Sequence, residues 1–184
     1  MLRSLVGSEM CIRDRPDPNA TTFPLANSFA AEHKPLVTAL YVEPGFFREM
    51  EPIPGAVAAL HAMVEAGYDV RICSAPLANS PHCLTEKAEW IMQHLGRQWI
   101  DRLILTRDKT LIRGTILIDD APTAKGTALK PTWRHVYFAQ PHNAKGAPGV
   151  DQLRDRIESW ADWRKIVNQV LGEIPRGSGR NALD

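Results

Sequence analysis

Two adjacent aspartates and an upstream lysine are the residues of this chain whose types and spacing best fit phosphate and metal chemistry. The segment Thr106–Asp120, TRDKTLIRGTILIDD, places Lys109 before the apolar run Ile116–Ile118, which ends in Asp119 and Asp120. Such a run fits a strand buried on both faces of a parallel sheet. Ligands of open α/β sheets bind beyond the carboxyl ends of the strands, so the two carboxylates are placed to hold a hard cation such as Mg²⁺.

A second strand end lies upstream, in the segment Asp69–Pro76, DVRICSAP. Ser74 and the backbone of Ala75 mark its exit, where hydroxyl and N–H donors can bind phosphate oxygens. An ammonium such as that of Lys109 can neutralise charge on a transferring phosphoryl group. Each feature alone has an ordinary alternative, because Ser74 can be a turn residue, Lys109 a solvated charge and the aspartate pair a polar strand end. Their combination, in this order, favours phosphoryl transfer.

The sequence around these residues resembles the 5′(3′)-deoxyribonucleotidases of the cytosolic and mitochondrial type, in the haloacid dehalogenase superfamily. The similarity extends from about Val37 to Trp163 and includes the pair His142–Asn143. Six segments match in order: YVEPGFFREMEPIPGAVAAL, ICSAP, EKAEWIMQHLG, LILTRDKT, ILIDD and PTWRHVYF. The resemblance implies an α/β fold, a doubly wound parallel sheet of Rossmann type with a small helical cap, here largely truncated. It also implies Mg²⁺-dependent dephosphorylation of nucleoside monophosphates through a phospho-aspartate.

The resemblance assigns roles at the phosphate end of the site. Asp120 becomes a metal ligand with Asp119 beside it, Ser74 and the Ala75 amide become phosphate donors, and Lys109 becomes the catalytic cation on the phosphoryl group. The family usually has threonine and serine where this chain has Ser74 and Ala75, so one hydroxyl donor remains and the second is lost.

Two further residues have two interpretations each. By resemblance Tyr41 packs against the nucleobase, but a core tyrosine beside Phe46 and Phe47 fits the sequence equally well. Lys87 belongs to an EK pair that the family places in the outer shell of its site. A surface lysine on a helix is the interpretation that we favour for Lys87.

The first residues lack the family's opening motif, an apolar strand that runs into a DxDGV-like sequence. Asp14 and Asp17 are spaced DxxD and flank Pro16, which cannot donate to a sheet ladder, so they are predicted to be loop residues. No residue then matches the nucleophile or the general acid, and we predict that the printed chain is inactive. We expect residues 1–20 to be a disordered or artefactual non-family stretch, such as a fusion or an assembly error.

The expected domain covers residues 21–172, with a cap remnant at about 21–45 and a flexible tail at 173–184. In the superfamily the first strand lies centrally, between the strands that here end at Ser74 and Asp120. Without it, these two strands are expected to face each other across a gap.

Composition narrows the remaining possibilities. The 184 residues are 44% hydrophobic and 23% charged, which suits one globular domain. A net charge of +1 gives no reason to expect a nucleic-acid polymer or a membrane as partner. Three cysteines without CxxC spacing favour a reducing cytoplasm. No GxxxxGK[ST] loop is present, which argues against a P-loop kinase, and the family's members suggest a possible homodimer.

Apolar periodicity predicts alternating helices and strands, and therefore a parallel sheet with right-handed crossovers. The expected helices cover a weak 27–40 segment interrupted by Pro35, then 54–66, a segment from an N-cap at Ser80 to Gly96, and a last one from Asp151. One strand is expected directly after Asp69, and three others are expected at 103–105, 116–118 and 135–138.

Two other functions stay open. The site could belong to a phosphatase of the same superfamily that acts on another small phosphate ester, because the cap and not the core selects the base. The chain could also be a non-catalytic fragment that keeps a phosphate pocket.

Overall fold

The described part of the chain consists of α-helices and short parallel strands, with four strands in succession between the last two α-helices. The computed structural model describes residues 31–121, 126–143 and 155–173. Its helices and strands, in order, are α1 Lys34–Leu40, α2 Ala56–Glu65, β1 Ile72–Ser74, α3 Cys83–His94, β2 Leu103–Leu105, β3 Ile116–Asp119, β4 Arg134–Phe138, β5 Arg156–Ile157 and α4 Trp163–Glu173. Four short 3₁₀ helices join them: η4 Arg97–Arg102, η5 Lys109–Leu111, η6 Pro141–Asn143 and η7 Trp160–Asp162.

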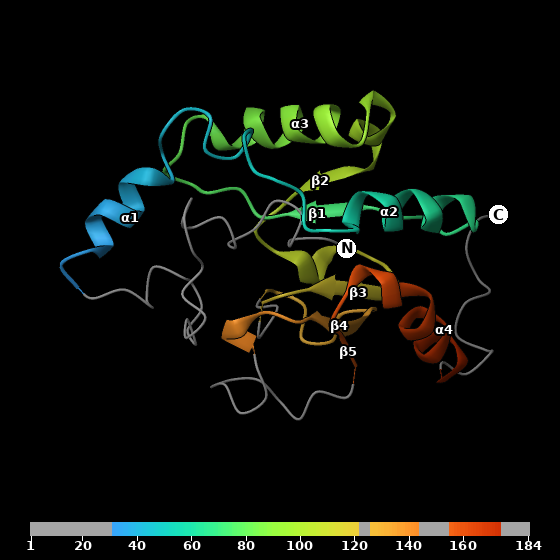
Figure 1. Ribbon diagram of the computed structural model, residues 1–184. Helices are drawn as coiled ribbons and strands as arrows, with labels where there is room; N and C mark the ends of the chain where they lie inside the picture. The colour runs from blue at the N-terminus through green and yellow to red at the C-terminus, as the bar shows by residue number, and fades with distance from the viewer. Residues whose placement is uncertain (1–30, 122–125, 144–154, 174–184) are drawn as a thin grey trace.

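The strands form two parallel sheets, one with the order β1-β2 and one with the order β3-β4-β5. Ile72 pairs with Leu103 in the first sheet, and Ile116 pairs with Arg134 in the second. Figure 1 shows α3 covering β1 and β2, while α4 lies beside the second sheet. The prediction of an α/β fold with parallel pairing is confirmed.

Strands β1 and β3 each pair on one side only within the described residues. The expected gap between the strands that end at Ser74 and Asp120 stays a prediction, because residues 1–30 lie outside the described part of the chain. A single doubly wound sheet and a truncated cap stay predictions. The helix α1, which projects away from the sheets in Figure 1, lies inside the segment predicted to be a cap remnant.

Glycines bound the helix α2. Gly55 has φ 79° at its N-cap and Gly67 has φ 86° after its end, a left-handed backbone that favours glycine. Buried residues at helical spacing, from Ala56 to Leu60 and Met63, turn one face of α2 toward the interior.

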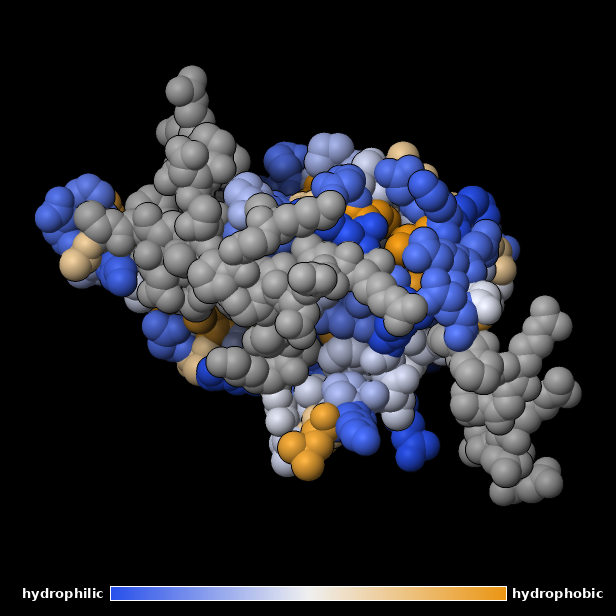
Figure 2. Space-filling model, turned by 90° about the horizontal axis from the view of Figure 1, so that it is seen from below, coloured by the Kyte–Doolittle hydropathy of each residue, from blue (hydrophilic) through white to orange (hydrophobic). Residues whose placement is uncertain are grey.

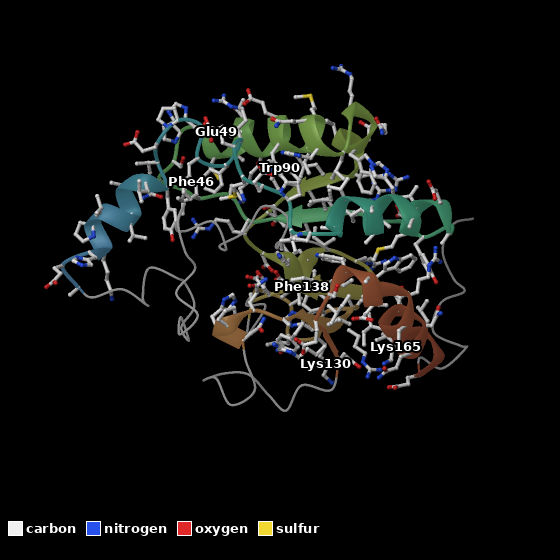
Figure 3. The ribbon with its side chains drawn as sticks, in the orientation of Figure 1. Phe46, Glu49, Trp90, Lys130, Phe138 and Lys165 are labelled. Carbon is white, nitrogen blue, oxygen red and sulfur yellow. The ribbon has the colours of Figure 1, made fainter. Side chains whose placement is uncertain are left out.

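One hydrophobic core joins both sheets, although no strand pairing between them occurs in the described part of the chain. Ile72 of β1 and Ile118 of β3 belong to the same buried cluster, together with Trp90 and Trp160. The Trp90 indole donates to the Met50 carbonyl at 2.5 Å, which satisfies its buried N–H. Figure 3 shows Trp90 pointing from α3 toward the sheets. Packing therefore holds the two sheets together.

Three sequence-based helix predictions need correction. Pro35 occupies the first turn of α1 and does not interrupt it, because a first-turn residue needs no N–H bond. The helix α3 begins at Cys83 with His82 as N-cap, since the Ser80 N–H closes a turn onto the Leu77 carbonyl at 3.3 Å. The predicted N-cap at Ser80 is therefore wrong.

The last helix begins at Trp163 and not at Asp151, which lies outside the described residues. Ile157 belongs to β5, where Phe138 of β4 pairs with it, and Trp160 belongs to η7. Both residues are buried, and their spacing fits a helical period. Ile157 is nevertheless buried in a strand and Trp160 in a 3₁₀ turn, so the predicted helix is wrong at these positions. The tail at 174–184 also lies outside the described residues.

The surface in Figure 2 is mainly hydrophilic where the structure describes it, and hydrophobic residues appear there in small groups. Among the described helices, none has the length and apolar character needed to cross a membrane.

Candidate active site

Lys109, Asp119 and Asp120 meet at the carboxyl end of β3. The Lys109 ammonium donates to Oδ2 of Asp119 at 2.9 Å, and the Asp120 backbone N–H donates to Oδ1 of Asp119 at 3.1 Å. Lys109 is 6% exposed, Asp119 1% and Asp120 0%. The alternative of Lys109 as a solvated charge is therefore wrong. Both oxygens of the Asp119 carboxylate thus accept hydrogen bonds, one from Lys109 and one from the Asp120 backbone.

The loop that bears Lys109 is fixed by the carboxylate of Asp108. This carboxylate accepts the Thr110 N–H at 2.9 Å and the Thr110 hydroxyl at 2.5 Å. It also accepts the N–H and hydroxyl of Thr127 at 2.7 and 2.6 Å. Hydrogen bonds from Thr110, and then from Thr127, lower the pKa of Asp108 well below its ordinary value. Asp108 thus ties the segment after β2 to the segment after β3.

Asp120 is held from a third segment, η6. Asn143 Nδ2 donates to the Asp120 carbonyl at 2.8 Å and to the Phe138 carbonyl at 2.7 Å. His142 Nε2 lies 3.1 Å from the same Asp120 carbonyl and 3.3 Å from its Oδ2. Arg156 donates to the Asn143 carbonyl at 2.7 Å. These buried contacts fix both the backbone and the carboxylate of Asp120.

The donor set suits Mg²⁺, which prefers carboxylate oxygens and is commonly bound through one or two carboxylates plus substrate phosphate and water. Lys109 balances the charge of Asp119, so a cation at this site would be attracted mainly by the carboxylate of Asp120. No group of three His, Cys, Asp or Glu side chains able to hold a metal occurs among the described residues. They would therefore supply part of an Mg²⁺ shell, with Asp120 as the main ligand.

Ser74, the last residue of β1, is fully buried and accepts a hydrogen bond from the Lys87 ammonium at 2.7 Å. Lys87 is only 3% exposed, so our interpretation of it as a surface lysine is wrong. It lies on the face of α3 that buries Cys83 and Trp90, at helical spacing from both. That spacing was a signal in the sequence. Ala75 is half-buried, and the role of its amide stays a prediction.

The end of β1 lies beside the segment that follows β2 and carries Lys109. The Thr106 N–H donates to the Ser74 carbonyl at 3.0 Å. Burial raises the pKa of the Cys73 thiol, the charge of Lys109 opposes that rise and Asp119 adds to it. The structure thus places Ser74 beside the segment that leads to Lys109, and Lys109 beside Asp119.

Tyr41 ends α1 and is half-buried. Its ring packs edge-to-face on Phe46, with centroids 5.3 Å apart, and Phe46 packs in the same way on Phe47 at 5.0 Å. The Lys87 ammonium lies 5.0 Å from the centroid of Phe47. Lys87 thus lies against both the Phe47 ring and Ser74, while the role of Tyr41 toward a base stays a prediction.

Sequence reasoning favoured a surface position for Lys87 over the outer-shell role that the resemblance implies, and assigned no role to His142 or Asn143. The pair His142–Asn143 follows the end of β4, at the same sheet edge as Asp119. Polar residues after consecutive parallel strands meet at one edge, and this rule could have identified the pair.

Most of this chain is similar in sequence to known proteins. The model of the family described as 5′ nucleotidase, deoxy (Pyrimidine), cytosolic type C protein matches residues 6–171. The chain belongs to this family. Its family is one of 5′-nucleotidases, which are phosphomonoester hydrolases.

Individual relatives agree. The chain is 43% identical over 156 residues to a Bordetella bronchiseptica protein named as a candidate 5′(3′)-deoxyribonucleotidase, covering 84% of this chain and 78% of that protein. It is 42% identical over 142 residues to the human 5′(3′)-deoxyribonucleotidase of cytosolic type, covering 76% and 70%. It is 36% identical over 132 residues to the human mitochondrial 5′(3′)-deoxyribonucleotidase, covering 71% and 57%. The resemblance inferred from the six segments is thereby confirmed.

The family match begins at residue 6, inside the stretch 1–20 that we predicted to be foreign to the domain. That stretch lies outside the described residues, so the predicted boundaries stay predictions.

Proposed function

We propose that this nucleotidase site removes the phosphate of (deoxy)ribonucleoside monophosphates with the help of Mg²⁺. The observation that supports the proposal most is the buried pair of Lys109 and Asp119 beside Asp120, at the end of β3. A buried ammonium held in place before substrate arrives can stabilise charge that develops on a phosphoryl group, without reorganising during the reaction.

Each residue at the phosphate end has a distinct task in this proposal. An ammonium has three N–H donors, so Lys109 can hold Asp119 and also donate to a phosphoryl oxygen. The Ser74 hydroxyl, oriented by Lys87, donates to a second oxygen, and the Ala75 amide to a third. Together these groups orient the phosphate and neutralise its charge.

Asp120, with Asp119 beside it, would hold the Mg²⁺. The ion would supply positive charge that lets two anions approach each other. His142 and Asn143 keep the Asp120 carbonyl and carboxylate in place, so the ligand is positioned before a metal binds.

We further propose that a nucleobase stacks on Tyr41, whose ring is half-buried against Phe46. Stacking on an aromatic ring contributes about 1–3 kcal/mol per base and reads no base edge. The names of the relatives support nucleotides as the substrate class. The cysteine pattern supports a cytoplasmic location. A homodimer stays a prediction.

Our proposal for these 184 residues by themselves is that they do not turn over substrate. The family's reaction proceeds through a phospho-aspartate, and the sequence contains no DxD pair to supply the nucleophile and the general acid. Among the described residues, β1 and β3 are each bonded to a strand on one side only, which is compatible with a central strand between them.

Phosphate release from deoxyuridine monophosphate with Mg²⁺ tests the proposal on two proteins, the printed chain and the same chain preceded by a family-like strand, DxDGV motif and cap. We expect turnover and a higher melting temperature in the second protein only. Turnover by the printed chain would show that a residue such as Asp14 or Asp17 supplies the nucleophile. Hydrolysis of small sugar phosphates but not of nucleotides would point to another phosphatase of the superfamily.

A further inference from the structure

The carboxylate of Glu86 binds a turn that lies far away in the sequence. Its Oε1 accepts the Gly45 N–H at 2.5 Å and its Oε2 accepts the Phe47 N–H at 3.0 Å. Glu86 is 4% exposed and lies in the first turn of α3. Burying a carboxylate is costly unless hydrogen bonds compensate for its lost hydration, and here two backbone amides and a helix N-terminus do so.

The segment that Glu86 holds consists of turns. The Glu49 N–H donates to the Gly45 carbonyl at 2.9 Å, and Gly45 has φ 91°, which favours glycine. Phe46 lies between α1 and α3 in Figure 3. We call the residues Gly45, Phe46 and Phe47 the aromatic turn. No helix or strand includes them, so side-chain bonds such as those of Glu86 fix their position.

The aromatic turn connects the proposed base contact with the phosphate end. Tyr41 packs on Phe46, and the Phe47 ring faces the ammonium of Lys87, which also donates to Ser74. Glu86 and Lys87 are consecutive, so one turn of α3 holds the backbone of the aromatic turn and the phosphate-binding hydroxyl at once.

From this arrangement we infer that Glu86 is a positioning residue that sets base recognition, by fixing the aromatic turn and with it Tyr41 at a set distance from Ser74. The inference rests on the proposed function, because it assigns the base contact to Tyr41. Removal of the carboxylate releases two amides, so the aromatic turn and Tyr41 move together. The phosphate contacts remain, since Lys87 and Ser74 lie on α3 and β1.

Two ligands that share the sugar phosphate test the inference on the full chain. Calorimetry would give the dissociation constants of deoxyuridine monophosphate and of 2-deoxyribose 5-phosphate, whose ratio isolates the base. In wild type we expect the nucleotide to bind about tenfold more tightly, which lies within the range of one stacking interaction. In Glu86→Ala we expect this ratio to fall to about two, while the sugar phosphate binds within about twofold of wild type.

Two further variants sharpen the comparison. Glu86→Gln keeps the shape and one acceptor oxygen but turns an NH₂ group toward the second amide, so an intermediate ratio is expected. Glu89→Gln is the matched control, because Glu89 lies on the same helix and pairs with Arg48 at 3.4 Å on the surface. Its ratio should equal that of wild type.

Amide hydrogen exchange in the wild-type protein tests the contact of Glu86 with the two backbone amides, even if a variant fails to fold. In wild type the Gly45 and Phe47 amides should be protected, and only the Glu86 variants should lose this protection. Rapid exchange of both amides in wild type would overturn the inference. So would an unchanged ratio in Glu86→Ala, and that result would leave the proposed function standing. A wild-type ratio near one would overturn the proposed base contact and the inference together.

Discussion

The phosphate end and the aromatic end of the site are built in different ways. At the phosphate end, Lys109, Asp119 and Asp120 are buried and linked by charge and by hydrogen bonds from three segments of the chain. At the aromatic end, Tyr41 is half-buried and reaches the rest of the molecule through edge-to-face ring contacts and the turn that Glu86 holds.

The difference follows from what each end must do. Stabilising a transferring phosphoryl group requires fixed charges in a site that excludes water, because preorganisation lowers the barrier. Stacking a base requires only an accessible ring face, and few bonds suffice to present it. We therefore expect substitutions at the phosphate end to abolish chemistry, and substitutions at the aromatic end to change selectivity.

The largest effect is expected from Asp120→Asn and Lys109→Ala, made in a chain with the family's first motif restored. Each should lower turnover by about 10²–10³, because each removes one preorganised charge. Steady-state hydrolysis of deoxyuridine monophosphate measures this, with circular dichroism to show that the fold persists. Lys109→Ala leaves Asp119 buried without its ammonium, so the double variant Lys109→Ala/Asp119→Asn separates lost stability from lost chemistry. Near-full activity in Asp120→Asn and Lys109→Ala would refute the site.

Asn143→Ala tests whether the phosphate end is rigid because it is hydrogen-bonded. The change removes the Asn143 donor from the buried carbonyls of Phe138 and Asp120, of which the second keeps its contact with His142, at a cost of about 1–3 kcal/mol for an unsatisfied group. Urea unfolding should show the loss, and the affinity for Mg²⁺ should fall with it. The surface substitution Glu89→Gln provides the baseline. A variant as stable as wild type would mean that these bonds do not hold Asp120.

Tyr41→Ala is expected to act on selection. We expect KM for a nucleoside monophosphate to rise about tenfold, since stacking of one base is lost, while hydrolysis of a small aryl phosphate changes little. Parallel kinetics on both substrates, in the chain with the restored motif, measure the contrast. Equal losses on the two would count against base stacking and in favour of a core role for Tyr41.

The smallest effect concerns Asp108, which joins two loops at the phosphate end. Its pKa is lowered in the folded state from an ordinary value of 3.8, mainly by hydrogen bonds from Thr110 and Thr127. A group with a lowered folded pKa contributes stability above its unfolded pKa and loses that contribution as the pH falls through the folded value. Asp108→Asn should therefore lower the melting temperature most near pH 7. The difference in melting temperature between wild type and variant should narrow as the pH falls below about 3.8. A difference in melting temperature that does not change with pH would exclude this charge effect.

Local sequence patterns located the strand ends and their chemistry. The strand predicted at 103–105 is β2, and the apolar run before Asp119 is β3, because short apolar runs bounded by polar residues already encode a buried strand. Asp119, Asp120, Ser74 and Lys109 could be chosen because parallel strands bring their carboxyl ends together. Their type and order in the chain were sufficient for that choice.

Tertiary structure alone decided the partners. Which carboxylate pairs with Lys109, that Lys87 turns inward to Ser74, and that Glu86 reaches the amides of the aromatic turn all depend on contacts between segments distant in sequence. Likewise, the spacing of Ile157 suits a helix, yet pairing with β4 makes it a strand. Periodicity reports which side chains are buried, whereas the packing of distant segments determines what buries them.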